Sequence, residues 1–581
     1  MALAEKVLRK INKLGLIPKA RRLLPRISLV LALFSILWLI TLPQDGNYRN
    51  CYISENALMP AQVNSYFRES EWNIVRGYRE EIHKLEEKPI DERNEIIKHW
   101  LLDLGLQVSS HKNGVSNDTL YAIMHASRGE NTEAMALVVP WINSDNEYNE
   151  GAMALGMALL RYFQRISVWS KNIILVIPPD GKQSLRSWVN AYHTTLDDTA
   201  GSIEAAIVIE YGKQGDNFEY YDMFYEGLNG QLPNLDLLNT ANLISSHEGM
   251  SCHMQGISDR AINFQNRLKT LFKGILKLAL AGTNDVHGHE AFSGWQIQAF
   301  TIKAQGTKGP DVTQFGRIVD STFRSVNNLL EKFHQSFFFY LMLSPKHFVS
   351  IGTYLPSAVM LAVSYALSGL SVVLNSGIDL SEIPQNITSL LTIATMIELF
   401  CLVLAIVIPL LPIDTIRLVP TIAQGFFILS ITGGKQRLTR TASYSLIAFA
   451  LLIIALLITA LLIVHFAIAF TIGLLALPLT FVPILIERDR KLAIICLSIS
   501  NPFSIILIAG VFPEFNDLFA QLILAWTQLQ SWTWLVVILG WFSSWLMIAY
   551  GASGIRSNID LKKVSPVLKE KSLEKSSIPK E

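Results

Sequence analysis

The stretch MALVVPWINSDNEYNEGAMALGMALLRYF, residues 135–163, decides the fold class of the polar part of this chain. It begins with a short apolar run that stops at Pro140 and continues through a loop rich in acids and amides. It ends in an apolar segment with helical spacing, Gly151–Phe163. This order predicts a buried strand, a loop and a helix that packs back on the strand.

The same pattern recurs between residues 43 and 346. Apolar runs bounded by turn residues predict further buried strands at Ile173–Ile177, Ala205–Tyr211 and Gln298–Ala304. Helical spacing predicts helices at Ser184–Tyr192 and Asn263–Ala281. The alternation predicts an α/β domain with a mostly parallel sheet flanked by helices. We expect residues 43–346 to lie outside the membrane, because they lack a run of about 18 apolar residues.

The rest of the 581-residue chain is strongly apolar. Hydrophobic residues make up 50% of the sequence and charged residues only 17%, which is typical of a membrane protein. Basic residues in 1–26 precede an apolar run at 27–42 that lacks a small-residue cleavage site, so we interpret it as a retained signal anchor with a cytosolic N-terminus. Residues 347–552 hold the other candidate spans, at 348–374, 388–411, 416–432, 443–464, 466–486, 492–511 and 532–551. In all, about eight spans are predicted.

An even number of spans returns the C-terminus to the cytosol and leaves the α/β domain in the lumen. Residues 553–581 are rich in Lys, Ser and Pro and predict a disordered cytosolic tail. Residues 513–530 predict a helix at the lumenal interface, whereas 329–343 predict either an interfacial helix or a segment packed in the core. The net charge of +1 gives no reason to expect nucleic acid as a partner.

Polar side chains gather just past the predicted strand ends, where α/β folds place their functional groups. They are Asn143, Asp145, Glu150, Asp180, Glu210 and His289. Carboxylates and histidines from separate strand ends are what a zinc hydrolase requires, because zinc needs about four ligands and activates a bound water. The order resembles the zinc aminopeptidase fold with two co-catalytic metals.

The resemblance to aminopeptidases then fails at particular residues. Trp141 and Asn143 stand where that family has a histidine ligand and its orienting aspartate, and tryptophan cannot bind a metal. We therefore favour a domain without metal or other cofactor, in which Glu210 and His289 form a hydrogen-bonded pair. A single bound metal ion and a two-zinc site remain the alternatives.

A second resemblance covers nearly the whole chain. It is carried by YISENALMP (52–60), YFRESEWN (66–73), GLNGQLPNLD (227–236) and LLEKFHQSFFFY (329–340). These stretches resemble the GPI-anchor attachment protein, the Gaa-type subunit of the GPI transamidase. The resemblance implies an endoplasmic-reticulum complex that removes a C-terminal propeptide from a proprotein and joins the new carboxyl end to the ethanolamine of a GPI lipid.

The same resemblance implies a division of labour between subunits. A cysteine protease subunit cuts the peptide bond, and the Gaa-type subunit helps to bind the lipid or proprotein and to assemble the complex. We therefore expect a non-catalytic pseudo-enzyme. The alternative is a metal-assisted, aminopeptidase-like catalyst that forms the amide bond to the GPI ethanolamine.

Other residues carry narrower expectations. Cys51 and Cys252 are candidates for a disulfide in an oxidising lumen, with free buried thiols as the alternative. Asn117 begins a sequon on the lumenal side and is a candidate for glycosylation. In the membrane region, Glu398, Arg417 and Pro502 are candidates for lipid or subunit contacts, because polar groups and helix breaks are costly there.

Overall fold

The computed structural model describes residues 16–62, 64–112, 114, 118–213, 215–260, 262–377, 382–432 and 438–555. The chain divides into two compact units. An α/β unit comprises residues 40–354 together with 524–531, and a helical unit comprises the flanking residues. Residues 1–15 of the basic segment and 556–581 of the predicted tail lie outside the described residues.

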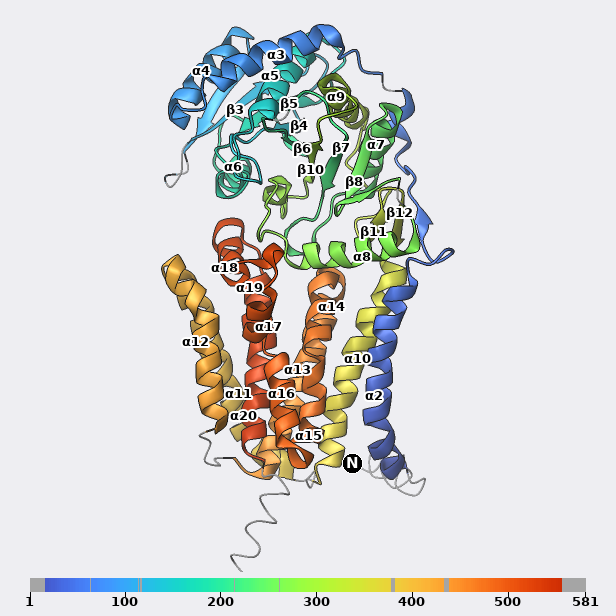
Figure 1. Ribbon diagram of the computed structural model, residues 1–581, viewed down its shortest axis with the longest axis vertical. Helices are drawn as coiled ribbons and strands as arrows, with labels where there is room; N and C mark the ends of the chain where they lie inside the picture. Colours follow the sequence, from blue (N-terminus) through green and yellow to red (C-terminus); the bar gives the residue numbers. More distant parts are fainter. Residues whose placement is uncertain are drawn as a thin grey trace, which may run out of the picture. The chain divides into compact units, whose positions relative to one another are not determined.

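A nine-stranded sheet forms the middle of the α/β unit, in the order β2-β3-β5-β4-β6-β10-β7-β8-β9 (Figure 1). Its strands are β2 (Gln107–His111), β3 (Thr119–Met124), β4 (Glu133–Val138), β5 (Asn172–Ile177), β6 (Ser202–Glu210), β7 (Tyr220–Phe224), β8 (Ser251–Met254), β9 (Ile257–Ser258) and β10 (Gln298–Gln305). The four strands predicted from sequence are β4, β5, β6 and β10, and all are confirmed.

The predicted mostly parallel sheet is a mixed sheet. The neighbours β5, β4, β6 and β10 are parallel to one another, and β7 is parallel to β8. The pairs β2/β3, β3/β5, β10/β7 and β8/β9 are antiparallel. The difference arises from strands outside the four apolar runs, because β2 and β3 follow each other too closely for a crossover helix.

Helices cover both faces of this sheet. On β3, Leu120 and Ala122 face one core together with α5, whereas Tyr121 and Ile123 face a second core together with α6. This alternation is the period of two expected of a strand buried on both sides. The helices of the unit are α3 (Glu69–His83), α4 (Ile90–Asp103), α5 (Glu150–Gln164), α6 (Gln183–Thr194), α7 (Leu235–His247), α8 (Phe264–Ala279) and α9 (Val312–Asn327).

One sequence expectation in the α/β unit is corrected. Residues 329–343 do not form a helix: α9 ends at Asn327, the chain then runs irregularly, and β11 (Tyr340–Ser344) follows. Leu329, Phe333 and Tyr340 are buried in the main core, so the packing alternative holds. β11 joins β12 (His347–Ser350) and β1 (Arg49–Asn50) in a small antiparallel sheet.

The helical unit holds membrane-spanning segments. In the described part of the chain, five helices are long and apolar enough to cross a membrane, or up to seven if each of two bent pairs is one span. The predicted count of about eight is not confirmed. The helices are α2 (Leu16–Thr41), α10 (Ile351–Asn375), α11 (Glu382–Val407), α12 (Ile413–Thr432), α13 (Arg440–Val464), α14 (Phe466–Leu475), α15 (Val482–Arg488), α16 (Arg490–Ile499), α17 (Pro502–Ala509), α18 (Leu518–Leu529), α19 (Thr533–Leu535) and α20 (Ser543–Ser553).

Serines join the first two long helices. The Ser28 hydroxyl of α2 donates to the Ser364 carbonyl oxygen of α10 at 2.9 Å, and the Ser364 hydroxyl donates back to the Ser28 carbonyl at 2.8 Å. About two helical turns further along α2, the Ser35 hydroxyl donates to the Ser357 carbonyl oxygen of α10 at 2.7 Å. Such small residues let two helices approach closely, and their hydrogen bonds hold the pair together in lipid.

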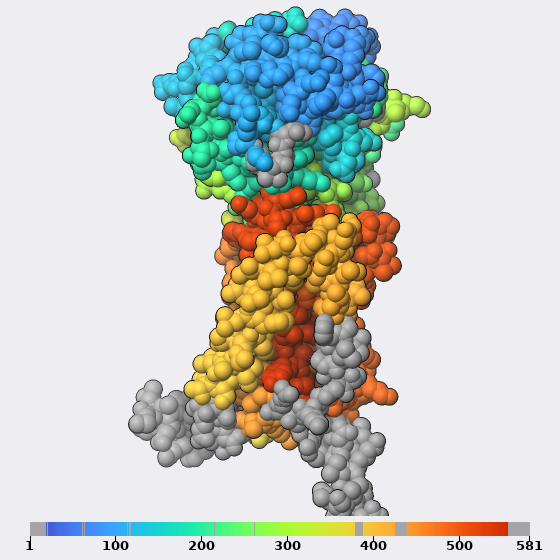
Figure 2. All heavy atoms as spheres, turned by 90° about the vertical axis from the view of Figure 1, so that its left-hand side faces the viewer, coloured from blue at the N-terminus to red at the C-terminus, as the bar shows by residue number. Residues whose placement is uncertain are grey.

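Helix α11 shows the opposite surface, which is apolar and exposed. It crosses the face of the helical unit seen in Figure 2, in yellow, and packs on α13 and α20. Its outer side chains include Met396, Leu399 and Val403, which are more than half exposed. Exposed apolar side chains along a long helix are typical of a lipid-facing surface.

A buried carboxyl in the α/β unit generates a first prediction. Burial raises the pKa of the Asp320 carboxyl on α9 to about 6, and the Ser65 and Tyr162 hydroxyls and Arg324 offset this only in part. Its stabilising contribution is present below the unfolded pKa of 3.8 and is lost as pH rises through 6. We expect Asp320→Asn to raise the unfolding midpoint of the purified chain by about 3 °C at pH 7.5 and not at pH 4.

The matched control is Asp103→Asn, because Asp103 lies exposed at the end of α4. That variant should unfold like the parent at both pH values. An equal gain for Asp320→Asn at pH 4 and pH 7.5 would contradict the assignment.

Candidate functional site

Glu210 is the last residue of β6, and its buried carboxylate organises the carboxyl edge of the parallel strands. The Ser144 backbone N–H donates to Oε1 at 3.2 Å and the Ser144 hydroxyl donates to Oε2 at 2.6 Å. His287 Nδ1 lies 3.3 Å from Oε2. Both carboxylate oxygens are therefore engaged by groups of the protein itself.

Lys303 supplies a cation at the same place, and the sequence analysis missed it. It lies on β10 directly beside Glu210 in the parallel register, and its ammonium lies 3.9 Å from Glu210 Oε2. The same ammonium lies 2.6 Å from Asp145 Oδ2 and 3.2 Å from the Ser144 hydroxyl. A lysine inside an otherwise apolar strand, opposite acidic strand ends, was the available signal.

Asp222 adds a further carboxyl to this cluster from β7. It pairs with Lys303 across the antiparallel register of β7 and β10. Burial raises the pKa of Asp222, and the charges of Lys277, Lys303 and His287 only partly reverse that effect. Cations that belong to the chain thus lie near Asp222 and offset part of the cost of its burial.

Both ring nitrogens of His289 have hydrogen-bond partners other than Glu210. Its Nδ1 lies 3.0 Å from the Thr301 hydroxyl and its Nε2 lies 3.2 Å from the Glu226 carbonyl oxygen. Burial lowers the pKa of His289 to about 3, so the ring is neutral at physiological pH. The expectation that His289 pairs with Glu210 is wrong, because the histidine that reaches Glu210 is His287.

A glycine sets the spacing of these two histidines. Gly288 has φ of +95°, a conformation that residues with a side chain rarely adopt, and it packs against Gly181 in the loop before α6. The turn at Gly288 directs His287 toward Glu210 and His289 toward Thr301.

The other predicted site residues serve the fold. Glu150 turns away to α3, where it accepts from Arg79 Nε at 2.9 Å and lies 2.8 Å from His83 Nδ1. The Asn143 side chain accepts from the backbone N–H groups of Asp145 and Glu147 and so closes the loop after β4.

Asp180 performs the same kind of local task before α6. Its carboxylate accepts from the Lys182 and Ser184 backbone N–H groups and from the Ser184 hydroxyl. Asn143 and Asp180 nevertheless line one small cavity of about 230 Å³ together with Lys182, Gln183 and Gln528. Its amide and charged groups suit a hydrogen-bonding ligand such as peptide backbone.

Trp141 occupies a core position and cannot replace a metal ligand. Its ring is buried and stacks on Tyr148, and its Nε1 donates to Asn94 Oδ1 at 2.9 Å. Among the described residues, no three His, Cys, Asp or Glu side chains lie close enough together to hold a metal ion. The residues present do not fit the zinc site of the aminopeptidase fold. Ser144, His287 and Lys303 already contact Glu210. Both ring nitrogens of His289 already have partners within the protein.

The two cysteines that are candidates for a disulfide, Cys51 and Cys252, are free thiols in the structure. Cys252 lies on β8 inside the core beside Tyr221, where burial raises its pKa. Burial likewise raises the pKa of Cys51 to about 12. Cys252 is buried and Cys51 is half-buried, and the raised pKa of each thiol means that neither is poised as a nucleophile. Asn117 lies outside the described residues.

Two of the three membrane candidates have side-chain partners within the helical unit, and the third, Pro502, begins a helix. Glu398 of α11 is half-buried and interacts with the Ser543 hydroxyl of α20. Arg417 Nη2 of α12 lies 2.9 Å from Asp517 Oδ2. Pro502 is the first residue of α17, which bends by 62° from α16, and Asn501 caps the new helix by accepting from the Phe503 N–H. At that position the missing N–H of proline costs no hydrogen bond.

Comparison with known proteins identifies the chain. A profile of the family described as "Gaa1-like, GPI transamidase component" matches residues 116–549. The chain belongs to this family. The GPI transamidase component GAA1 of Saccharomyces cerevisiae is 43% identical over 622 residues, covering 98% of this chain and 100% of that protein. The gaa1 component of Schizosaccharomyces pombe is 33% identical over 377 residues, covering 60% of this chain and 64% of that protein.

Solved structures resemble part of the chain at low identity. A zinc-dependent exopeptidase of Bacteroides vulgatus, described as putative in its own report, shares 12% identity with a TM-score of 0.28 and covers 45% of this chain and 98% of its own. A glutaminyl cyclase of Fimbriiglobus ruber shares 12% identity with a TM-score of 0.32 and covers 46% and 99%.

The Gaa1-like chain is thus a membrane subunit of the GPI transamidase, an endoplasmic-reticulum complex that contains further subunits. The sequence-based expectation of this family and this role is confirmed.

The Glu210 cluster generates a second prediction. Lys303→Met removes the cation beside two carboxylates, so we expect the free energy of unfolding to fall by about 3 kcal/mol. Adding Glu210→Gln to Lys303→Met should recover part of that loss, because the buried charge is removed as well. Unfolding midpoints of the purified single and double variants measure this coupling, and strictly additive losses would contradict the ion cluster.

Proposed function

We propose that this Gaa1-like chain is a non-catalytic subunit whose α/β unit lies in the lumen and helps to assemble the complex and hold its substrates. The observation that carries the proposal is the Glu210 cluster. The carboxylate that would bind a metal is engaged by Ser144, His287 and Lys303. A buried carboxylate with these partners supports the fold and has no open position for a catalytic metal.

The membrane orientation that we propose rests on basic residues at one end of the helices. Arg21, Arg22 and Arg26 begin α2, and Arg440 at the start of α13 pairs with Glu487 near the end of α15. Clustered Arg and Lys mark the cytosolic side of a membrane protein. We therefore place both termini in the cytosol and residues 43–346 in the lumen of the endoplasmic reticulum.

The partners that we propose are a cysteine protease subunit, which cuts the proprotein, and the GPI lipid, which receives it. In the α/β unit, the cavity beside Asn143 and Asp180 is the candidate for holding extended proprotein chain. In the helical unit, Glu398 is the candidate for the lipid, because a half-buried carboxylate between lipid-exposed side chains of α11 is costly unless it has a role.

The non-catalytic proposal is tested with Glu210→Gln, which keeps the shape of the side chain and removes its charge. In purified complexes we expect transamidation to stay within about threefold of the parent, because no reacting atom depends on this carboxylate. Co-purification of the other subunits reports assembly in the same samples. A loss of about hundredfold or more in an intact complex would show that the subunit does chemistry, as metal-assisted catalysis requires.

The proposed contact of Glu398 with the GPI lipid is tested with the variant Glu398→Gln. The control is Asp414→Asn, because the Asp414 side chain is 88% exposed. We expect Glu398→Gln to raise KM for the GPI lipid by about fivefold with little change in kcat, because uniform binding is lost. The control should match the parent. An unchanged KM for Glu398→Gln would remove Glu398 from the lipid path.

A further inference from the structure

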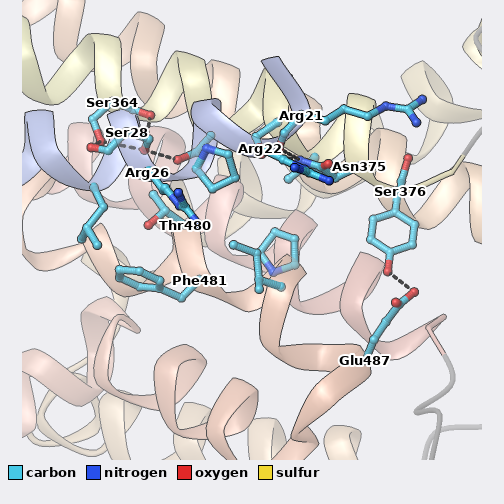
Figure 3. Close-up of a pocket in the computed structure, with 18 of the residues that line it drawn as sticks. Arg21, Arg22, Arg26, Ser28, Ser364, Asn375, Ser376, Thr480, Phe481 and Glu487 are labelled. Carbon is cyan, nitrogen blue, oxygen red and sulfur yellow. Dashed lines mark hydrogen bonds between the residues drawn. The ribbon is translucent and has the colours of Figure 1, made fainter. Parts of the chain in front are cut away.

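A cavity of about 620 Å³ lies within the helical unit, at the end where α2 begins and α10 ends. It is enclosed by α2, α10, α13 and the turn that joins α14 to α15. Figure 3 shows Arg22 and Arg26 projecting from α2 above Thr480 and Phe481, with Glu487 toward the far side. The cavity beside Asn143 and Asp180 in the α/β unit is a separate feature.

The cavity is strongly cationic. Arg21, Arg22, Arg26 and Arg488 all line it, and no carboxylate of a described residue lies within ion-pair distance of their guanidinium groups. One carboxylate is present, that of Glu487, and it is already engaged by Arg440 Nη2 and by the Tyr444 hydroxyl, each at 2.6 Å. Among the residues that the structure describes, these guanidinium groups therefore have no acidic partner, which favours binding of an anionic ligand.

The arginine-bearing turns of α2 are held against α10 before any ligand arrives. The Asn375 side-chain amide donates to the Arg21 carbonyl at 3.1 Å, and the buried Ser28 hydroxyl contacts Ser364 and Ser368. A site whose walls are fixed in advance loses less entropy when it binds. The hydroxyls of Ser371 and Thr480 add polar groups to the same walls.

Apolar side chains lie next to the arginines along α2. Leu29 lines the cavity, and Val30 and Leu33 beyond it are 60% and 51% exposed. A soluble phosphate would use only the arginines, whereas a phospholipid would place its phosphate among them and its acyl chains along these side chains. The combination of the two surfaces favours an amphiphile.

We propose that this cavity binds the phosphate-bearing head group of an anionic glycerophospholipid in the leaflet at this end of the helices. Arginine fits phosphate because its planar guanidinium donates two parallel hydrogen bonds to phosphate oxygens. Basic pockets between membrane helices recognise anionic head groups in this way. The cavity is much larger than one phosphate, so it also accepts a polyol such as inositol. With the orientation proposed above, the leaflet is cytosolic, opposite the lumenal reaction.

The test uses the purified full-length chain in neutral detergent, titrated with short-chain phosphatidylinositol, short-chain phosphatidylcholine or soluble glycerophosphoinositol, with binding followed as an increase in unfolding midpoint. We expect phosphatidylinositol to bind at least about tenfold more tightly than either of the others. Equal binding of glycerophosphoinositol would overturn the lipid assignment in favour of a soluble anion. Phosphatidylcholine carries the same phosphate together with a cationic choline, so its equal binding would overturn the selectivity for an anionic head group.

The double variant Arg22→Gln/Arg26→Gln should weaken phosphatidylinositol binding by about tenfold. The matched control is the double variant Arg490→Gln/Lys491→Gln. These two residues begin α16 and do not line the cavity. An equal loss in the control would mean generic surface attraction and would contradict the site. Arg488→Gln, on the opposite wall, gives a second measurement: it should also weaken binding, and unchanged affinity there would contradict the cavity as the location.

Discussion

The contact between Lys303 and Glu210 is the interaction on which the α/β unit of this subunit depends. A buried carboxylate is costly unless a cation and hydrogen-bond donors compensate it. Here the ammonium comes from the neighbouring parallel strand, and Ser144 and His287 complete the set. The chain itself thus supplies the positive charge that compensates this buried carboxylate.

This arrangement holds together the loops at the edge of the sheet. Lys303 reaches Asp145 in the loop after β4, and the loop before β10 is held by His287 and by the contacts of His289 with Thr301 and the Glu226 carbonyl. Glu210, at the end of β6, thus contacts both the loop after β4 and the loop before β10. The polar residues at the strand ends therefore hold the edge of the sheet, which is consistent with the proposed role in assembly.

The sequence predicted the parts of the fold that follow from local pattern. The apolar runs that became β4, β5, β6 and β10 are bounded by turn residues, and each is confirmed. The predicted break at Pro502 is also present, because proline cannot continue a helix. The outer antiparallel strands were not predicted, since their pairing depends on long-range contacts. The aromatic run before Tyr340 has the composition of an interfacial helix, and tertiary packing overrode that local preference.

The candidate site was predicted in outline and not in its contacts. Sequence order placed Glu210, Asn143 and Asp180 at strand ends, but it could not show that Glu150 turns toward Arg79 or that His287 replaces His289 as the partner of Glu210. Lys303 was missed because strand register, which sets it beside Glu210, is not readable from a single strand.

The central claim is that protein cations replace a metal at the carboxyl edge of the sheet. The most direct measurement is the metal content of the purified, full-length subunit by mass spectrometry after dialysis against zinc and then against metal-free buffer. We expect well under one zinc per chain, and the same for Glu210→Gln. One zinc per chain that is lost in Glu210→Gln would contradict it and would restore the metal-assisted alternative.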